Sequence, residues 1–275
     1  LSDFNDNNLI DVMASQQISD SNFHIGYFAQ NTNINFSGFN TLQSDLKSID
    51  DNIFNIDLDG DLDKDLIYVS DFDELKIHYN LGSGSYSNAD IKELPIDGLI
   101  RNFRVNDIND VDKDGDNDLV ITRYKDKMYS PLEDSSTVWI GINDGDANFS
   151  FEMINEEFTA AIYEARLGDF DNDNDLDLLT IGFGFSPDFG IEVPSYLEPF
   201  FRWYKNEDGN FSSSVELPIP ERVERVPSVS DFQIADLEGN GIVDIFASFA
   251  VRDTCEDQVH AFNCSFIYVF SIYKL

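Results

Sequence analysis

Ten residues near the middle of the chain, DVDKDGDNDL at 110–119, place aspartate at alternating positions with a glycine after the third. Carboxylates this close together repel one another unless a positive charge compensates them. Two interpretations follow: a solvated acidic turn, or a loop that wraps a hard divalent cation. Ca²⁺ accepts about six to eight oxygen ligands, whereas Mg²⁺ keeps its waters and Zn²⁺ prefers His and Cys. The residue types therefore favour calcium among the metals.

The acidic decapeptide recurs along the chain, which makes it a unit of organisation. Every copy has an apolar residue at its second and tenth positions and an oxygen-bearing side chain at its first, third, fifth and ninth positions. Strong copies are DLDGDLDKDL at 57–66, DVDKDGDNDL at 110–119 and DFDNDNDLDL at 169–178. Weaker copies are DFNDNNLIDV at 3–12 and DLEGNGIVDI at 236–245. The pattern indicates several equivalent sites along one chain.

A bend at the sixth position would let each loop close around a cation, and that bend needs a residue tolerant of positive φ. Glycine or asparagine stands there in four copies: Gly115, Gly241, Asn8 and Asn174. The copy that begins at Asp57 has Leu62 instead. A two-residue slip, with Asn55 as the first ligand, would move Gly60 to the sixth position. We keep Asp57 first, because the apolar second and tenth positions then match those of the other copies.

Short β-strand patterns fill the sequence between the acidic loops. Buried runs such as DLVITRY and DLLTIGF follow the loops, and a hairpin flanked by aromatic residues recurs in phase with them. The hairpins are YFAQNTNINFS, IHYNLGSGSYS, WIGINDGDANFS and WYKNEDGNFS. Units of this length with about four strands each predict an all-β chain, a β-propeller of about five four-stranded blades. We expect one domain over 1–275, with units starting near 3, 57, 110, 169 and 236.

These loops and hairpins resemble the FG-GAP/VCBS repeats of integrin alpha-chain propellers and of many secreted bacterial proteins. The resemblance extends over most of the chain and implies a calcium-binding propeller. Members of this family serve in adhesion, in carbohydrate binding and, in some polysaccharide lyases, in catalysis. The resemblance is informative about fold and calcium and says little about the ligand.

Calcium ligation is what the resemblance implies for the acidic loops, with the seventh residue supplying a backbone carbonyl. The strong loops contribute Asp57, Asp59, Asp61, Asp63 and Asp65; Asp110, Asp112, Asp114, Asp116 and Asp118; and Asp169, Asp171, Asp173, Asp175 and Asp177. The weaker loops contribute Asp3, Asn5, Asn7 and Asp11, and Asp236, Glu238, Asn240 and Asp244. The expected cofactor is therefore Ca²⁺, at three strong sites and two weaker ones.

A binding surface is expected at the opposite end of the blades, where three long insertions fall. Long loops in a compact domain are usually functional, and these insertions carry aromatic and cationic residues. The candidate ligand-binding residues are Tyr124, Tyr129, Phe185, Phe189, Tyr196, Arg252 and His260. The aromatic rings would stack on sugars or anchor a protein partner. The alternative is that they only cover the edges of the blades.

The formal net charge of −36 disfavours nucleic acid and anionic membranes as partners, because both need a basic surface. No apolar run is long enough to span a membrane. Cys255 and Cys264 flank a short polar segment, and a disulfide between them would indicate an oxidising, extracellular compartment; two free thiols are the alternative. Sequons at Asn35, Asn148, Asn210 and Asn263 include three copies of the hairpin N-F-S, so structural repetition accounts for most of them before glycosylation does.

Three functions remain open at the level of sequence. The leading hypothesis is a secreted or cell-surface module that binds a carbohydrate or protein ligand without catalysis. The runner-up is a polysaccharide lyase, in which a Tyr or His base and an arginine beside a uronate carboxylate would support β-elimination. The third is a structural spacer in a surface assembly. No nucleophile elbow, phosphate loop or His-Glu metal motif is visible in the sequence.

Overall fold

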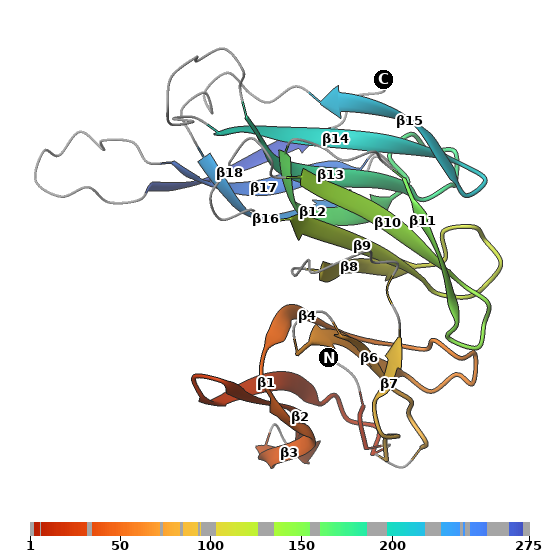
Figure 1. The fold of residues 1–275 in the computed structure, drawn as a ribbon, viewed down its shortest axis with the longest axis vertical. Helices are drawn as coiled ribbons and strands as arrows, with labels where there is room; N and C mark the ends of the chain where they lie inside the picture. Colours follow the sequence, from red (N-terminus) through yellow and green to blue (C-terminus); the bar gives the residue numbers. More distant parts are fainter. Residues whose placement is uncertain are drawn as a thin grey trace, which may run out of the picture. The chain divides into compact units, whose positions relative to one another are not determined.

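All regular structure in the described part of the chain is β-strand (Figure 1). This computed structural model describes residues 3–5, 7–31, 35–71, 74–82, 85–92, 94, 103–125, 135–154, 160–185, 197–217, 227–236, 239, 243–251 and 264–271. Among these residues there is no helix with the length and hydrophobicity that a membrane span needs. The all-β fold predicted from the strand patterns is therefore confirmed.

Five sheets are present in the described residues, and the sheet order follows the sequence order within each. The first contains β1 (Val12–Ser19), β2 (Asn22–Asn31) and β3 (Asn35–Leu46). The second contains β4 (Ile49–Ile56), β5 (Asp65–Ser70), β6 (Glu74–His78) and β7 (Asp90–Lys92). The third contains β8 (Phe103–Asn109), β9 (Asp118–Lys125), β10 (Ser135–Asn143) and β11 (Phe149–Met153). Each sheet corresponds to one sequence repeat.

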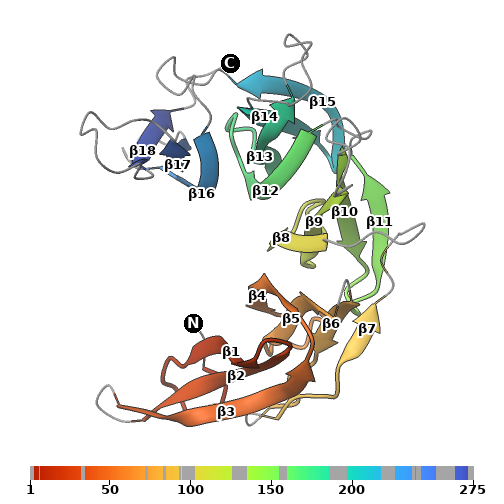
Figure 2. The same ribbon diagram turned by 60° about the vertical axis from the view of Figure 1, so that its left-hand side comes forward.

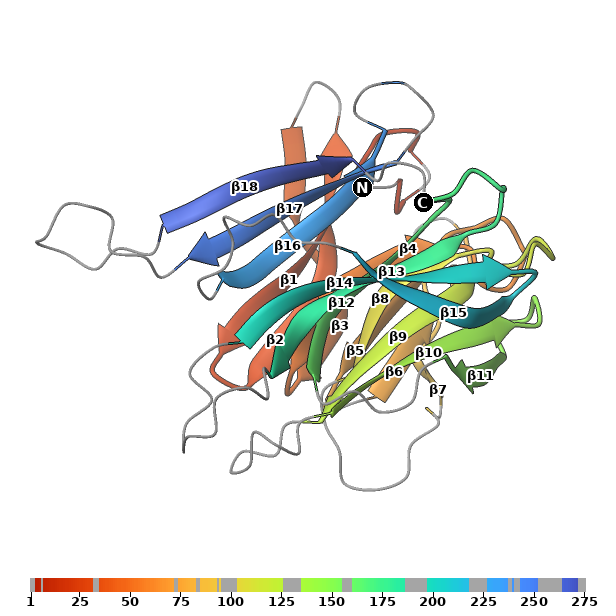
Figure 3. The ribbon, with the colours of Figure 1, turned by 90° about the horizontal axis from the view of Figure 1, so that it is seen from above.

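The last two sheets complete the series. The fourth contains β12 (Ala160–Gly168), β13 (Asp177–Phe185), β14 (Leu197–Glu207) and β15 (Asn210–Leu217). Figure 2 shows these four strands in order across the sheet, with β12 and β15 at its edges. The fifth contains β16 (Pro227–Ala235), β17 (Asp244–Val251) and β18 (Cys264–Ser271), which lie side by side in Figure 3.

The four-stranded arrangement is confirmed for the three middle sheets, whereas the closure and the blade count of a propeller stay predictions. The first and fifth sheets have three strands in the described residues, whereas the three middle sheets have four. The cause is the phase of the repeat. In the middle sheets the acidic loop joins the first strand to the second, whereas in the first sheet the acidic loop precedes β1. The fifth sheet ends with the strand that would lead into its hairpin.

The chain divides into two compact units, each with its own core. One comprises Leu1–Val105 with Asn143–Phe151, and the other comprises Asn106–Ile142 with Glu152–Leu275. In the second unit, one cluster packs around Val120, Leu178 and Tyr204, and another packs around Phe201 and Phe232. In the first unit, Ile25, Leu66 and Tyr68 form the main cluster. Whether both units belong to a single domain stays a prediction.

The apolar positions of the acidic loops are buried as the repeat predicts. The second position is buried in four copies: Phe4, Leu58, Val111 and Phe170. The tenth position is buried in four copies as well: Leu66, Leu119, Leu178 and Ile245. The three strong loops are thus anchored to a core at both ends, and burying a large apolar side chain contributes roughly 1.5–3 kcal/mol. The acidic residues between the two anchors are held where those anchors place them.

Candidate metal centre

The first aspartate of four acidic loops holds the backbone of the turn. Its Oδ2 accepts the N–H of the sixth residue: from Asn8 to Asp3 at 2.6 Å, Leu62 to Asp57 at 3.0 Å, Gly115 to Asp110 at 3.1 Å and Asn174 to Asp169 at 3.0 Å. Its Oδ1 accepts an N–H from within the turn in the same four loops. One side chain therefore sets the same loop conformation four times.

Positive φ values recur at the fourth and sixth positions. The sixth position has φ of 62° at Asn8, 75° at Leu62, 102° at Gly115 and 68° at Asn174. The fourth has φ of 74° at Gly60, 66° at Lys113, 62° at Asn172 and 68° at Gly239. The bend predicted at the sixth position is confirmed in these loops, and Gly241 lies outside the described residues. The second bend, at the fourth position, was not predicted.

The register of the loop at 57–66 follows from the same geometry. Leu62 adopts the left-handed conformation although that conformation costs a non-glycine residue roughly 1–2 kcal/mol. Its side chain is 88% exposed, so no packing interaction explains its position. Asp57 accepts its N–H as the first aspartates of the other loops do. The register that begins at Asp57 is therefore correct, and the two-residue slip is wrong.

The ninth aspartate is buried in all five loops, and in four of them it accepts backbone N–H groups. These carboxylates, at most 1% exposed, are Asp11, Asp65, Asp118, Asp177 and Asp244. In four loops Oδ2 accepts the N–H of the second residue: Phe4, Leu58, Val111 and Phe170, at 2.8–3.3 Å. In three loops Oδ1 accepts an N–H from the hairpin: Gln30, Asn80 and Asn206, at 2.7–2.9 Å. The ninth aspartate thus ties loop, strand and hairpin together.

Burial raises the pKa of two of these carboxylates. Burial raises the pKa of Asp65 to about 6, although the two N–H groups that it accepts act in the opposite direction. Burial also raises the pKa of Asp177, and again its backbone hydrogen bonds partly offset the effect. The chain keeps these acids buried because they satisfy backbone donors that would otherwise lack partners.

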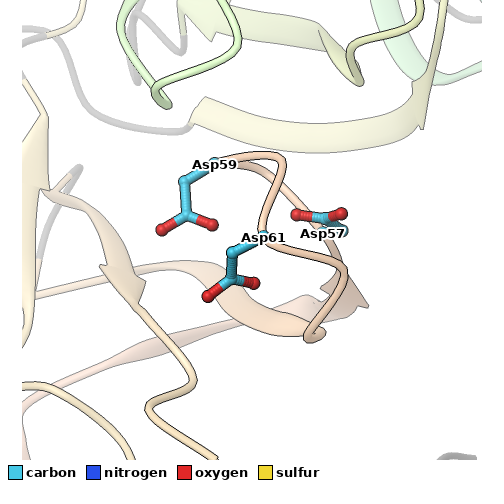
Figure 4. A group of neighbouring side chains, drawn as sticks. All are labelled: Asp57, Asp59 and Asp61. Atoms are coloured by element: carbon cyan, nitrogen blue, oxygen red, sulfur yellow. The ribbon is translucent and has the colours of Figure 1, made fainter.

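Three triads of acidic residues bring their oxygens close enough to share one cation. The ligand atoms of each triad lie within 4.8 Å of one another, and Figure 4 shows the first triad on its loop. The triads are Asp57, Asp59 and Asp61; Asp110, Asp112 and Asp118; and Asp169, Asp171 and Asp173. Every donor is a carboxylate oxygen, which suits a hard divalent cation such as Ca²⁺.

The pKa values of two third-position aspartates reflect the crowding of the carboxylates. The pKa of Asp59 is raised, first by desolvation and then by the charges of Asp61 and Asp57. The pKa of Asp112 is raised for the same reasons, with Asp114 and Asp110 as the neighbouring charges. A bound cation would reverse both effects by favouring the ionised form.

The remaining predicted ligands lie outside the three triads. The seventh-position aspartates Asp63, Asp116 and Asp175 are not members of these triads, and Asp175 pairs with Lys113. Asp114, at the fifth position of its loop, accepts the N–H of Asp116. In the first loop, Asn7 accepts the N–H of Leu9 as the fifth-position aspartates accept theirs. In the last loop, Asp236 and Asp244 are described, whereas Glu238 and Asn240 lie outside the described residues.

A buried hairpin asparagine was missed at the level of sequence. Asn206 donates to the carbonyl oxygens of Val111 and Leu176 at 3.1 and 3.0 Å, so it links one acidic loop to the preceding one. Asn143 donates in the same way to the carbonyl of Leu58 at 2.9 Å. The signal was present in the hairpin repeats IHYN, IGIN and WYKN, which end at the same asparagine.

The predicted ligand-binding end lies almost entirely outside the described residues. Tyr129, Phe189, Tyr196, Arg252, His260 and Cys255 fall there. Tyr124, Phe185 and Cys264 are at strand ends in β9, β13 and β18. The insertions follow β9, β13 and β17, and the acidic loops precede these same strands. That these insertions form a binding surface away from the acidic loops stays a prediction. The disulfide stays a prediction.

Comparison with known proteins identifies one repeat. Residues 110–180, from the second strong acidic loop into the strand after the third, match the family described as FG-GAP-like repeat. The matched segment contains two of the three acidic triads. No curated protein matches the chain.

Proposed function

Because residues 110–180 carry an FG-GAP-like repeat, we propose that the chain is a calcium-stabilised extracellular β-propeller that binds a carbohydrate or protein ligand without catalysis. In this proposal the five sheets are blades, and the acidic loops hold Ca²⁺ at one end of them. The observation that carries the calcium part is the threefold repetition of an oxygen-only triad on one loop conformation.

The structural role of the cation follows from the charge of the loops. Each triad gathers carboxylates that would repel one another, yet the loop joins the first two strands of a sheet. A bound Ca²⁺ would cancel the repulsion and so stabilise the folded state, because the unfolded chain has no preformed site. In the loops at 57–66 and 169–178, the residues that would hold it are the first, third and fifth aspartates. In the loop at 110–119 they are Asp110, Asp112 and Asp118.

We place ligand binding at the strand ends away from the acidic loops, because the ends at those loops are already used for internal contacts. At the acidic ends, hydrogen bonds join loop, hairpin and strand, so few polar groups of the described residues are left there to contact a ligand. The insertions after β9, β13 and β17 are the segments whose length the sheets do not require. Their aromatic residues fit sugar rings or an apolar protein surface.

The test has two arms. Calorimetric titration of the metal-free chain with Ca²⁺ should give a stoichiometry of at least two, and absence of binding would remove the calcium part of the proposal. A glycan array, read with Ca²⁺ and again with chelator, should then reveal carbohydrate ligands.

The catalytic alternative has its own readout. Incubation with acidic polysaccharides would produce absorbance at about 235 nm if the chain were a lyase, because β-elimination leaves an unsaturated product. A robust, calcium-dependent signal would replace the non-catalytic proposal. Arg252 and His260 would then be the first residues to substitute.

A further inference from the structure

Among the described residues, the third strong loop, 169–178, differs from the other two because lysines reach its carboxylates. The ammonium of Lys205 pairs with Asp171 and lies 2.9 Å from Oδ2 of Asp173. Those two aspartates are members of the third triad. The ammonium therefore contacts two of the three carboxylates that a cation in this loop would use.

The position of Lys205 in the hairpin accounts for its contact with this loop. Lys205 immediately precedes the buried Asn206, as Ile142 precedes Asn143 and Tyr79 precedes Asn80. These residues occupy equivalent register positions, because each directly follows the residue that pairs with the tenth position of the acidic loop in its own sheet. An isoleucine or tyrosine there brings no positive charge, whereas lysine brings one on a flexible stem.

A second lysine contributes from the preceding loop. Lys113, the fourth residue of the loop at 110–119, pairs with Asp175 of the third loop. It does so from the left-handed conformation, which glycine or asparagine occupies at the same position in three other loops. Two lysine charges therefore pair with three carboxylates of this loop, two in the triad and one beside it.

We infer that Lys205 is a tethered cation that competes with Ca²⁺ for the third loop, so that this loop is held together without metal and binds Ca²⁺ more weakly than the other two. The inference rests on the proposed calcium binding and adds a graded response to it. At low calcium the loops at 57–66 and 110–119 would be filled, and the third only after Lys205 is displaced. An exposed ion pair is a modest interaction, so the difference in affinity should be about three- to tenfold.

Calcium titration of the full chain by calorimetry tests the inference with matched variants. Lys205→Met should tighten the weakest of the strong-loop sites about three- to tenfold, and adding D169N should abolish that gain. Lys64→Met removes the same charge from the exposed eighth position of the first strong loop and measures the general effect of charge. Ile142→Lys places a lysine beside the loop at 110–119 and should weaken that site by a similar factor.

Melting in chelator provides a second readout. K205M should lower the melting temperature of the metal-free chain more than K64M does, and calcium should restore it. Equal affinities and equal melting temperatures for K205M and K64M would overturn the inference while leaving the first two sites intact. A wild-type chain that binds no calcium at all would instead overturn the proposed function. The two failures are therefore distinguishable.

Discussion

The acidic loops at 110–119 and 169–178 have the same backbone and different sources of positive charge. In both, the first aspartate accepts the N–H of the sixth residue and the ninth aspartate accepts the N–H of the second. Within the described part of the chain, only the later loop has a lysine paired with its third and fifth aspartates. The comparison separates aspartates that only build the loop, such as Asp177, from the triad members that we propose bind a cation, although Asp110 and Asp169 do both.

The largest effect should come from the residues that build the loop. Asp177→Ala removes a buried acceptor for the N–H groups of Phe170 and Asn206. Each unsatisfied buried donor costs about 1–3 kcal/mol, so we expect a loss of about 3–5 kcal/mol in the free energy of unfolding. Asp65→Ala should cost a comparable amount in the loop at 57–66, because Asp65 accepts the N–H groups of Leu58 and Asn80 and lies outside the triads. Chemical denaturation checks both values.

The exposed Glu207 is the matched control, since Glu207→Ala removes an acid at the end of β14 and should change stability by less than about 0.5 kcal/mol. Calcium should not rescue Asp177→Ala, because the lost hydrogen bonds are internal to the protein. If calcium restored wild-type stability to it, the division between structural and metal-binding aspartates would be wrong.

The next effect concerns the link between successive loops. Asn206→Ala would leave the carbonyls of Val111 and Leu176 and the N–H of Gly209 without their side-chain partner. We expect a loss of about 2–3 kcal/mol, and a similar loss for Asn143→Ala. Urea denaturation followed by tryptophan fluorescence would measure it. Asn206→Asp retains the acceptor but not the donor, so an effect as small as 0.5 kcal/mol in that variant would contradict the importance of the donated bonds.

Much of this arrangement could be predicted from sequence because the repeat encodes it locally. The strands after the loops, the buried second and tenth positions and the bend at Gly115 all follow from residue type and spacing. The role of the ninth aspartate could not, since alternation makes it look identical to the first. Its burial depends on β5, β9 or β13 leading directly into a core.

Lys205 was beyond prediction for a related reason. It lies beside its loop only after the chain has passed through β13, an insertion and β14, so neighbours in space are distant in sequence. Aligning the hairpins by their asparagine would have found the position, but not the ion pair. Charge partners between elements depend on register, here Leu178 with Tyr204 and Leu179 with Trp203.

The calcium-dependent gain in stability should differ between the two loops, by less than the losses expected for the loop-building residues. Asp112→Asn removes a triad carboxylate from the loop without a triad-bound lysine, and should abolish its share of calcium stabilisation, about 1–2 kcal/mol at calcium well above the dissociation constant. Asp171→Asn in the lysine-bearing loop should reduce the calcium-dependent gain by less than half as much. Melting curves of both variants, with calcium and with chelator, would test this order. Equal losses would remove the distinction between the loops.

The smallest effect is on pH dependence, and it arises in the strands that lead into the two loops. Three residues before its loop, β8 carries Asp107, whereas β12 carries Arg166 at the equivalent position. Burial raises the pKa of Asp107, although the N–H groups of Leu167 and Ile108 and the charge of Arg166 act against it. A carboxyl with a raised pKa in the folded state favours folding when protonated, and this contribution is lost as pH rises through that pKa.

Asp107→Asn should therefore change the pH profile of stability in one direction. Relative to this variant, the wild-type chain should gain about 1–2 °C in melting temperature as pH falls from 7.5 toward 4.5. The gain should be the same with calcium or chelator, because Asp107 is outside the triads. A gain that appeared only in chelator would mean that the pKa of Asp107 responds to the charge of the acidic loop. The separation between scaffold residues and cation-binding residues would then hold only within the loop.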